Sequence, residues 1–179
     1  MTESPYKKVN ARPPRSAHAP KRSKSTAASW REEVAHIKTQ RAAVRGTFMQ
    51  ERMERHELTA DLERALTQLA AVLPVQEAEA LSPEIATERR ALAGILGAKR
   101  QQLATKLESR SAFSPLSPTE REEIRFELAR TTVKLAMLKQ RQGEYLAAEE
   151  LLASAQSHAR KLPMHHQVSL RDLGLPAQG

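Results

Sequence analysis

A long stretch without proline, from Ser29 to Leu73, constrains the fold of this chain more than any other feature. Apolar residues recur along it at spacings of three and four, which is the pattern of a helix with one buried face. Ser29 and Glu32 have the spacing of a capping box, and Pro74 follows the last apolar residue. The stretch therefore predicts one long amphipathic helix over residues 29–73. Its apolar stripe begins with Trp30, Val34, Ile37, Val44 and Phe48 and continues through Leu58, Leu62, Ala65, Leu69 and Val72.

The middle of this predicted helix interrupts the apolar stripe. The same spacing puts Arg41, Glu51 and Arg55 on the apolar face. An unbroken helix of this length would span about 66 Å, which is longer than a small bundle. We therefore expect a kink or hinge between Gly46 and Glu57. The face before the break is the predicted interface with a partner helix, and its residues are Trp30, Val34, Ile37, Val44 and Phe48.

The basic residues are unevenly distributed along the chain. The net charge is +8, and eight of the 29 Lys and Arg residues but only one acid, Glu3, lie in residues 1–31. The rest of the chain is close to neutral. Residues 1–28 also contain four prolines and no apolar period, so they are predicted to be a disordered basic tail. The predicted polyanion-binding residues of this tail are Lys7, Lys8, Arg12, Arg15, Lys21, Arg22 and Lys24.

A tail of this kind is compatible with several roles. It can anchor the protein to nucleic acid, to an acidic protein surface or to an anionic membrane, and it can also serve solubility alone. The run from Lys21 to Ser25 fits a nuclear address or a phosphorylation site. The Arg and Ser content fits a mitochondrial transit peptide, although the prolines oppose the helix that such peptides form.

A second helix start is predicted at Ser82 and Pro83, with serine as the cap and proline in the first turn. Residues 74–81 then form a short linker. Gly94 and Gly97 lie one turn apart within the predicted helix, and each costs about 1 kcal/mol relative to alanine. Each of these glycines either allows a close contact with a neighbouring helix or is simply tolerated.

The segment Ser117–Glu120 carries the strongest start signal in the chain. It combines a capping serine, a first-turn proline and a capping-box glutamate. The helix that follows is predicted to run up to Gly143, which separates it from a last helix that ends at Pro163. Residues 82–162 are therefore predicted to form a small antiparallel helical bundle. Residues 163–179 are predicted to be a C-terminal tail with a brief turn.

Part of this bundle places small and large residues at fixed positions of a helix–turn–helix pair. The residues are Leu135, Ala136, Gly143, Tyr145, Ala148, Leu152 and Ala155. With them, residues 129–162 resemble one tetratricopeptide repeat, whose period is about 34 residues. Thr132 and Lys139 stand where that motif has tryptophan and tyrosine. The resemblance implies a helical hairpin that packs against its neighbours and binds peptides or proteins, and it implies no catalytic residue.

The sequence offers little catalytic or metal-binding chemistry. It has no cysteine, which excludes disulfides, thiolate metal sites and a cysteine nucleophile. Glu33 and His36 have the spacing of two di-iron ligands on one helix face, but such a site needs a second copy of the motif. His165 and His166 can bind a stray metal ion within the predicted C-terminal tail. We therefore expect no catalytic residue, no cofactor and no specific metal site.

These patterns together predict an all-α protein. It would consist of a long amphipathic N-terminal helix, a small antiparallel helical bundle with the repeat-like hairpin, and a disordered basic N-terminal tail. No apolar run approaches the roughly 20 residues needed to cross a bilayer, and no apolar signal-peptide segment follows Met1. We expect an intracellular protein of the cytoplasm or cytoskeleton, with the nucleus and mitochondrion left open.

The expected function is that of a non-enzymatic structural or adaptor subunit of a larger assembly. Such a subunit would dock on protein partners by helix packing, and its basic tail would hold RNA or an acidic filament surface. One alternative is a nucleic-acid- or ribosome-associated protein that binds through phosphate contacts. Another is a secreted bacterial effector whose N-terminus acts as a delivery signal. The oligomeric state is left open.

Overall fold

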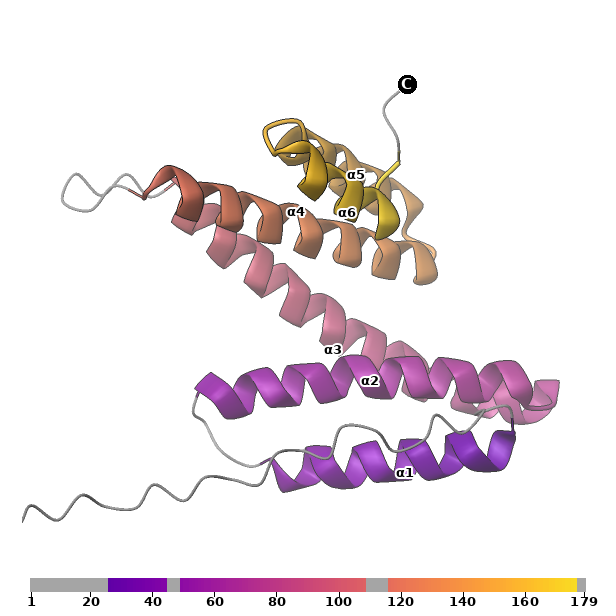
Figure 1. The fold of residues 1–179 in the computed structure, drawn as a ribbon. Helices are drawn as coiled ribbons and strands as arrows, with labels where there is room; N and C mark the ends of the chain where they lie inside the picture. Colours follow the sequence, from indigo (N-terminus) through magenta and orange to yellow (C-terminus); the bar gives the residue numbers. More distant parts are fainter. Residues whose placement is uncertain (1–25, 45–48, 109–115, 177–179) are drawn as a thin grey trace, which may run out of the picture.

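The computed structural model describes residues 26–44, 49–108 and 116–176, and these residues form six helices and no strand (Figure 1). The helices are α1 (Ala27–Ala43), α2 (Met49–Val72), α3 (Val75–Glu108), α4 (Pro118–Arg141), α5 (Tyr145–Ala159) and α6 (Met164–Asp172). The predicted all-α class is confirmed. Within the described residues, no helix combines the length and the apolar character needed to cross a membrane.

The predicted long helix is two helices that lie side by side and run in opposite directions (Figure 1). A kink or hinge was expected between Gly46 and Glu57; α1 ends at Ala43 and α2 begins at Met49, so the break falls at the start of that range and residues 49–57 belong to α2. The apolar stripe explains the pairing, because its two halves pack on each other. Val34 and Ile37 of α1 share one core with Leu62 and Leu66 of α2. The stripe is therefore buried within the chain itself.

The cap of α1 also differs from the prediction. The helix begins at Ala27, inside the segment predicted to be disordered, and its N-cap is Thr26. The Thr26 hydroxyl accepts a hydrogen bond from the Ser29 backbone N–H at 3.4 Å. Ser29 is therefore a residue of the first turn, where its N–H is satisfied by the threonine.

A ladder of three ion pairs links α1 to the first half of α3. The pairs join Arg31 to Glu77, Lys38 to Glu84 and Arg41 to Glu88, each at 2.6 Å. Residue numbers rise together along both helices, so α1 and α3 run parallel while α2 runs antiparallel to them. Arg41 interrupts the apolar stripe because its guanidinium binds the buried Glu88 carboxylate at two points, which desolvates the pair and fixes its geometry.

The start of α3 lies earlier than predicted. The helix begins at Val75, so the expected linker over residues 74–81 is almost entirely helical and Pro83 lies inside the helix. A proline in a helix interior removes one backbone hydrogen bond and costs about 3 kcal/mol. Packing offsets this cost, because Ile85 is buried in the first core and Leu81 packs against it. The ion-pair ladder to α1 holds the same turns, because Glu77, Glu84 and Glu88 lie on the same face of α3 as Leu81 and Ile85.

The two glycines within α3 do not mark a close helix contact. A methyl group added at Gly94 or at Gly97 would meet no atom within 4 Å. The interpretation that these glycines admit a neighbouring helix is therefore wrong for both positions, and the glycines are tolerated residues on an open side of α3.

The capping box that begins α4 is confirmed. The Ser117 hydroxyl accepts from the Glu120 N–H at 3.2 Å, and the Glu120 carboxylate accepts from the Ser117 N–H at 2.9 Å. The pKa of the Glu120 carboxyl is lowered, chiefly because the hydrogen bond that it accepts from the Ser117 backbone N–H favours its charged form.

Gly143 separates α4 from α5 as predicted, with a φ of +81° that suits glycine. The N–H of Gly143 donates to the Gln140 carbonyl and that of Glu144 to the Lys139 carbonyl, both at 3.0 Å. This is a Schellman motif, which satisfies carbonyls that the end of α4 would otherwise leave free. The chain thereby turns back, and α5 packs along α4.

The predicted C-terminal tail is in part a packed helix. In α6, Leu170 is fully buried, and Leu175 beyond the helix is buried as well. Both share a second core with Ala129 and Val133 of α4. A single leucine with no apolar period around it was too weak a signal for this helix, because nine residues offer only two turns in which a pattern can repeat.

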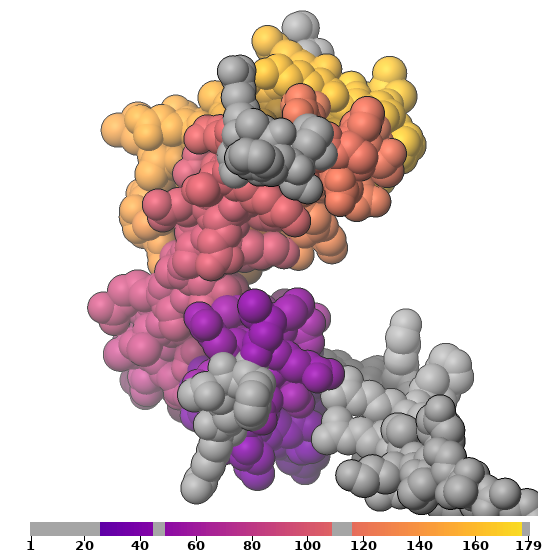
Figure 2. Space-filling view, turned by 90° about the vertical axis from the view of Figure 1, so that its left-hand side faces the viewer, coloured from indigo at the N-terminus to yellow at the C-terminus, as the bar shows by residue number. Residues whose placement is uncertain are grey.

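The molecule therefore has two cores, and α3 passes from one to the other (Figure 1). The first lies among α1, α2 and the start of α3, and the second among α4, α5 and α6. Figure 2 shows the two ends separated by a notch on one side, with α3 as the connection.

A buried carboxylate joins the two ends. Glu63 of α2 accepts from Arg89 of α3 at 2.8 Å and from the Thr67 hydroxyl at 3.1 Å, and it lies 3.5 Å from Arg141 at the end of α4. Arg89 also donates to the Arg141 carbonyl at 3.3 Å. Because the Glu63 side chain is only 3% exposed, these partners take the place of the water that would otherwise solvate the carboxylate.

Candidate anion-binding site

The predicted polyanion-binding residues, Lys7, Lys8, Arg12, Arg15, Lys21, Arg22 and Lys24, lie outside the described residues. Their role stays a prediction. A search for other sites in the described part of the chain therefore starts from the surface of the helices.

The predicted partner-helix face needs a correction. Val34 and Ile37 are buried in the first core, and Trp30 packs against that core. Val44 is half-buried at the end of α1, and Phe48 lies outside the described residues. This face is covered by α2 and α3 of the same chain. The apolar residues of α2 and Ile85 of α3 share one core with it. Val34 and Ile37 are therefore not free to bind a partner in this fold.

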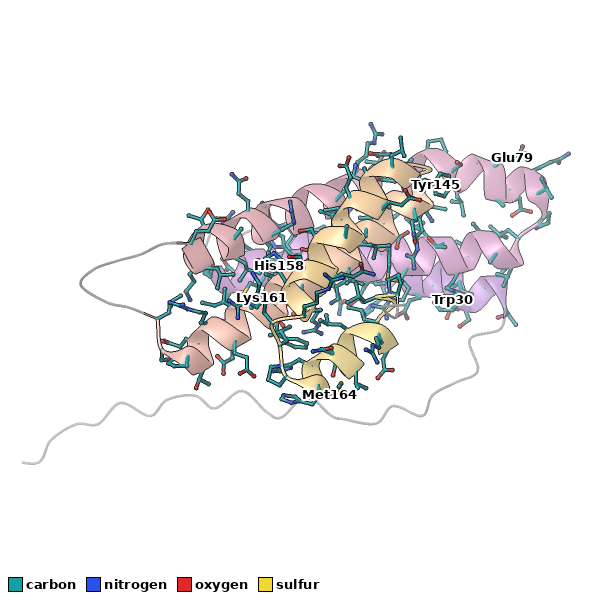
Figure 3. All side chains as sticks on the ribbon, turned by 90° about the horizontal axis from the view of Figure 1, so that it is seen from above. Trp30, Glu79, Tyr145, His158, Lys161 and Met164 are labelled. Atoms are coloured by element: carbon teal, nitrogen blue, oxygen red, sulfur yellow. The ribbon has the colours of Figure 1, made fainter. Side chains whose placement is uncertain are left out.

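Four basic side chains from three helices gather at another place. They are Arg100 of α3, Arg125 of α4, and His158 and Lys161 at the end of α5; we call them the cationic cluster. Burial lowers the pKa of His158 below its usual value, and the positive charges of Lys161, Arg125 and Arg100 lower it further. Such an effect falls off with distance, so each of the three other cations lies within electrostatic reach of the His158 imidazole. Figure 3 shows His158 in the last turn of α5 and Lys161 nearby, just beyond the helix.

The cationic cluster has no acidic partner in the described part of the chain. Among the described residues, none of its four side chains takes part in an ion pair or a side-chain hydrogen bond. The Nε of Arg100 is in addition buried with no acceptor. A buried donor without a partner costs about 1–3 kcal/mol, which an acceptor from outside the chain would remove.

A neighbouring group of charges shows the contrast. Glu127 of α4 binds Lys99 at 3.1 Å and Arg130 at 3.0 Å. Burial raises the pKa of Glu127, but the hydrogen bonds from Arg130 and Lys99 outweigh it and lower the pKa overall. The carboxylate is thus charged and neutralises the cations around it. The cationic cluster lacks a carboxylate in the corresponding role.

The position of the cluster explains part of its composition. His158 and Lys161 lie at the C-terminal end of α5, where the helix dipole stabilises positive charge. Arg100 and Arg125 belong to other helices, α3 and α4, and helix packing brings them to this place. Two guanidinium groups, an ammonium and an imidazole that converge in this way offer donors suited to a carboxylate or a phosphate group.

Sequence reasoning missed the cationic cluster because its members lie far apart along the chain. Only His158 and Lys161 are close in sequence, at the spacing of three that places two residues on one helix face. Each residue alone is an ordinary helix-surface cation. The packing of α4 between α3 and α5 is what brings them together, and no local pattern encodes it.

A second surface feature lies at the other end of α5. Tyr145, one of the residues that carry the repeat resemblance, is 66% exposed, and the adjacent Leu146 is 79% exposed. Figure 3 shows Tyr145 at the start of α5, far from His158 at its end. Ala148 and Ala155, on the face of the helix toward α4, are fully buried. A large aromatic and a leucine in solvent are suited to contact another protein.

The antiparallel pair of α4 and α5, closed by Gly143, is the hairpin that the repeat resemblance implied. Any two helices joined by a glycine turn and packed through alanines share this geometry, so membership of the repeat family stays a prediction. No protein-family model, no curated protein and no solved structure matches this chain.

Proposed function

We propose that this protein is a non-enzymatic structural or adaptor subunit that binds an acidic partner through the cationic cluster. The observation that carries the proposal is the gathering of four basic side chains that pair with no carboxylate of the described residues, one of them with a buried donor that has no acceptor there. The basic tail of residues 1–28 would add long-range attraction to the same partner. Tyr145 and Leu146 would supply apolar contact to a protein.

The size of the cluster favours an acidic protein segment as the partner. Four side chains at one end of the molecule can hold one or two carboxylates or a phosphorylated side chain. Binding to duplex DNA commonly involves contacts with about 6–10 phosphates along a surface. The repeat resemblance also implies peptide binding. A nucleic-acid partner is the second candidate, and it would rely mainly on the basic residues of the tail.

Fluorescence anisotropy with a glutamate-rich peptide and with a single-stranded RNA tests the proposal. The variant is the pair Arg100→Gln and Arg125→Gln. The matched control is Arg52→Gln with Arg64→Gln, which removes the same charge from exposed positions on α2. We expect the cluster variant to bind the peptide at least about tenfold more weakly, since one charge-assisted hydrogen bond is worth about 1.5–3 kcal/mol.

The control pair should change the peptide affinity by less than about twofold at physiological salt, because distant exposed charges are screened. Equal weakening in both pairs would show that only overall charge matters, and the cluster would then not be the site. RNA binding that depends on the cluster, with no peptide binding, would favour the second candidate. Deletion of residues 1–25 should make binding less sensitive to salt while leaving the helical signal in circular dichroism intact.

The same titration carries a pH test of His158. A bound anion favours the charged imidazole, so it raises a pKa that the free protein holds below the usual value. Binding therefore takes up a proton, and the affinity should rise as the pH falls through about 6.5. His158→Gln should remove most of this rise. An affinity that falls toward acidic pH in the wild type would contradict the assignment of His158 to the site.

A further inference from the structure

A separate group of side chains brings α6 against α4. Glu122 lies in the second turn of α4, and His165 and His166 lie in the first turn of α6. One ligand atom from each of these three residues lies within 4.8 Å of the other two. Figure 3 shows the start of α6 at Met164, beside the end of α5. The fold therefore joins a histidine pair and a carboxylate that are more than 40 residues apart in the sequence.

We propose that Glu122, His165 and His166 form a binding site for a divalent transition-metal ion such as Zn²⁺. Two imidazole nitrogens and a carboxylate oxygen are a ligand set that zinc accepts, with a fourth position left for water or another ligand. The absence of cysteine means that a soft thiolate site is not in competition.

The distances fit this ion. Ligand atoms about 2.0–2.2 Å from a tetrahedral zinc lie about 3.3–3.6 Å from one another. The His166 Nε2 and the Glu122 Oε1 are 3.3 Å apart, so these two atoms already have the required separation. His165 is exposed, and a side-chain rotation can bring its nitrogen closer without disturbing the core.

The surroundings hold one of the histidines in place. The Phe126 ring stacks on the His166 ring with centroids 4.2 Å apart and an interplanar angle of 27°. Phe126 itself packs against the second core, so the plane of His166 is fixed by a rigid part of the molecule. The His165 and His166 rings are 4.1 Å apart and tilted by 43°. A ligand whose orientation is set before binding loses less entropy when the metal arrives.

A metal ion here would connect the start of α6 to α4. The buried side chain of Leu170 already attaches the other end of α6 to the second core. Without metal, Glu122 and His166 can form an ion pair whenever the histidine is protonated. The ion pair does not involve His165, whereas the proposed metal site does. A substitution of His165 therefore distinguishes the ion pair from the metal site.

Isothermal titration of the untagged full-length chain with ZnCl₂, after treatment with a chelator, tests the site. We expect one zinc ion per chain. His165→Ala should weaken binding at least about tenfold, since even the loss of a group that only orients a metal ligand costs about 10–100-fold. His36→Ala is the matched control, because it removes an exposed histidine of α1 and should leave the zinc affinity unchanged.

Two further measurements make the result decisive. Cobalt(II) should give the intense visible absorption of a four-coordinate site in the wild type and lose it in His165→Ala and in Glu122→Gln. Zinc should raise the thermal midpoint of the wild type and not that of His165→Ala, whose midpoint without metal should equal that of the wild type. Equal zinc affinity in His165→Ala and the wild type would overturn the proposed site, and so would the absence of zinc binding by the wild type. The three side chains would then hold no metal ion, and Glu122 and His166 would form only an ion pair.

Discussion

At the scale of single residues, two serines that precede prolines have opposite roles. Ser117 is the N-cap of α4, and its hydroxyl accepts from the Glu120 N–H. Ser82 has the same Ser-Pro sequence but is an exposed residue inside α3. A capping hydroxyl satisfies a free N–H, whereas a serine inside a helix is a poorer helix former than alanine.

We therefore predict that Ser117→Ala and Ser82→Ala change stability in opposite directions. Ser117→Ala should lower the free energy of unfolding by about 1 kcal/mol. Ser82→Ala should leave it unchanged or raise it by about 0.5 kcal/mol. Urea unfolding followed by circular dichroism measures both. A loss of similar size in both variants would mean that Ser82 caps a helix, and α3 would then begin after the proline.

At the scale of elements, α3 carries helix-weakening residues that its packing outweighs. Pro83, Gly94 and Gly97 all lie inside this 34-residue helix. The sequence predicted that the helix begins at Ser82 and Pro83, because helix propensity and turn chemistry depend only on neighbouring residues. The contacts that offset the cost of the proline come from α1 and α2. Part of them are ion pairs such as Arg31 with Glu77, which lie 46 residues apart in the sequence.

The glycines of α3 allow a direct test of this description. Because an added methyl group meets no atom at Gly94 or Gly97, Gly94→Ala and Gly97→Ala should each raise the free energy of unfolding by about 1 kcal/mol. Gly143→Ala is the contrasting variant and should lower it by about 1–2 kcal/mol, since its φ of +81° is unfavourable for alanine. Destabilisation by Gly94→Ala or Gly97→Ala in urea unfolding would reveal a helix contact at that position.

The elements show which signals in a sequence are dependable. Ser117 and Gly143 were placed correctly because a cap and a left-handed turn are decided by a few neighbouring atoms. The apolar stripe of residues 29–73 identified the correct buried face. Its first half was predicted to bind a helix of a partner, but it packs against the second half of the same stripe. The cationic cluster was not predictable, because it depends on how three helices are packed. The sequence named His165 and His166 as possible metal ligands, but only the packing of α6 on α4 brings Glu122 to them.

At the scale of the whole molecule, two cores are joined by α3 and by the charges around Glu63. The carboxylate of α2 is buried and receives Arg89 of α3, and Arg141 brings in the end of α4. An apolar contact would hold these helices at any register, whereas a charge with fixed hydrogen-bond partners holds them at one. The relative placement of the two ends therefore depends on this side chain as well as on the packing of α3 against α2 and α4.

Glu63→Ala should consequently lower the free energy of unfolding by about 3 kcal/mol, because it leaves the largely buried Arg89 without its counter-charge. Glu57→Ala, at an exposed position on the same helix, should change it by less than about 0.5 kcal/mol. Because each core keeps its own apolar contacts, loss of the link should also separate their unfolding. Hydrogen exchange would then show α4 and α5 protected after α1 and α2 have opened. A single transition with unchanged midpoint in Glu63→Ala would mean that α3 alone joins the two ends.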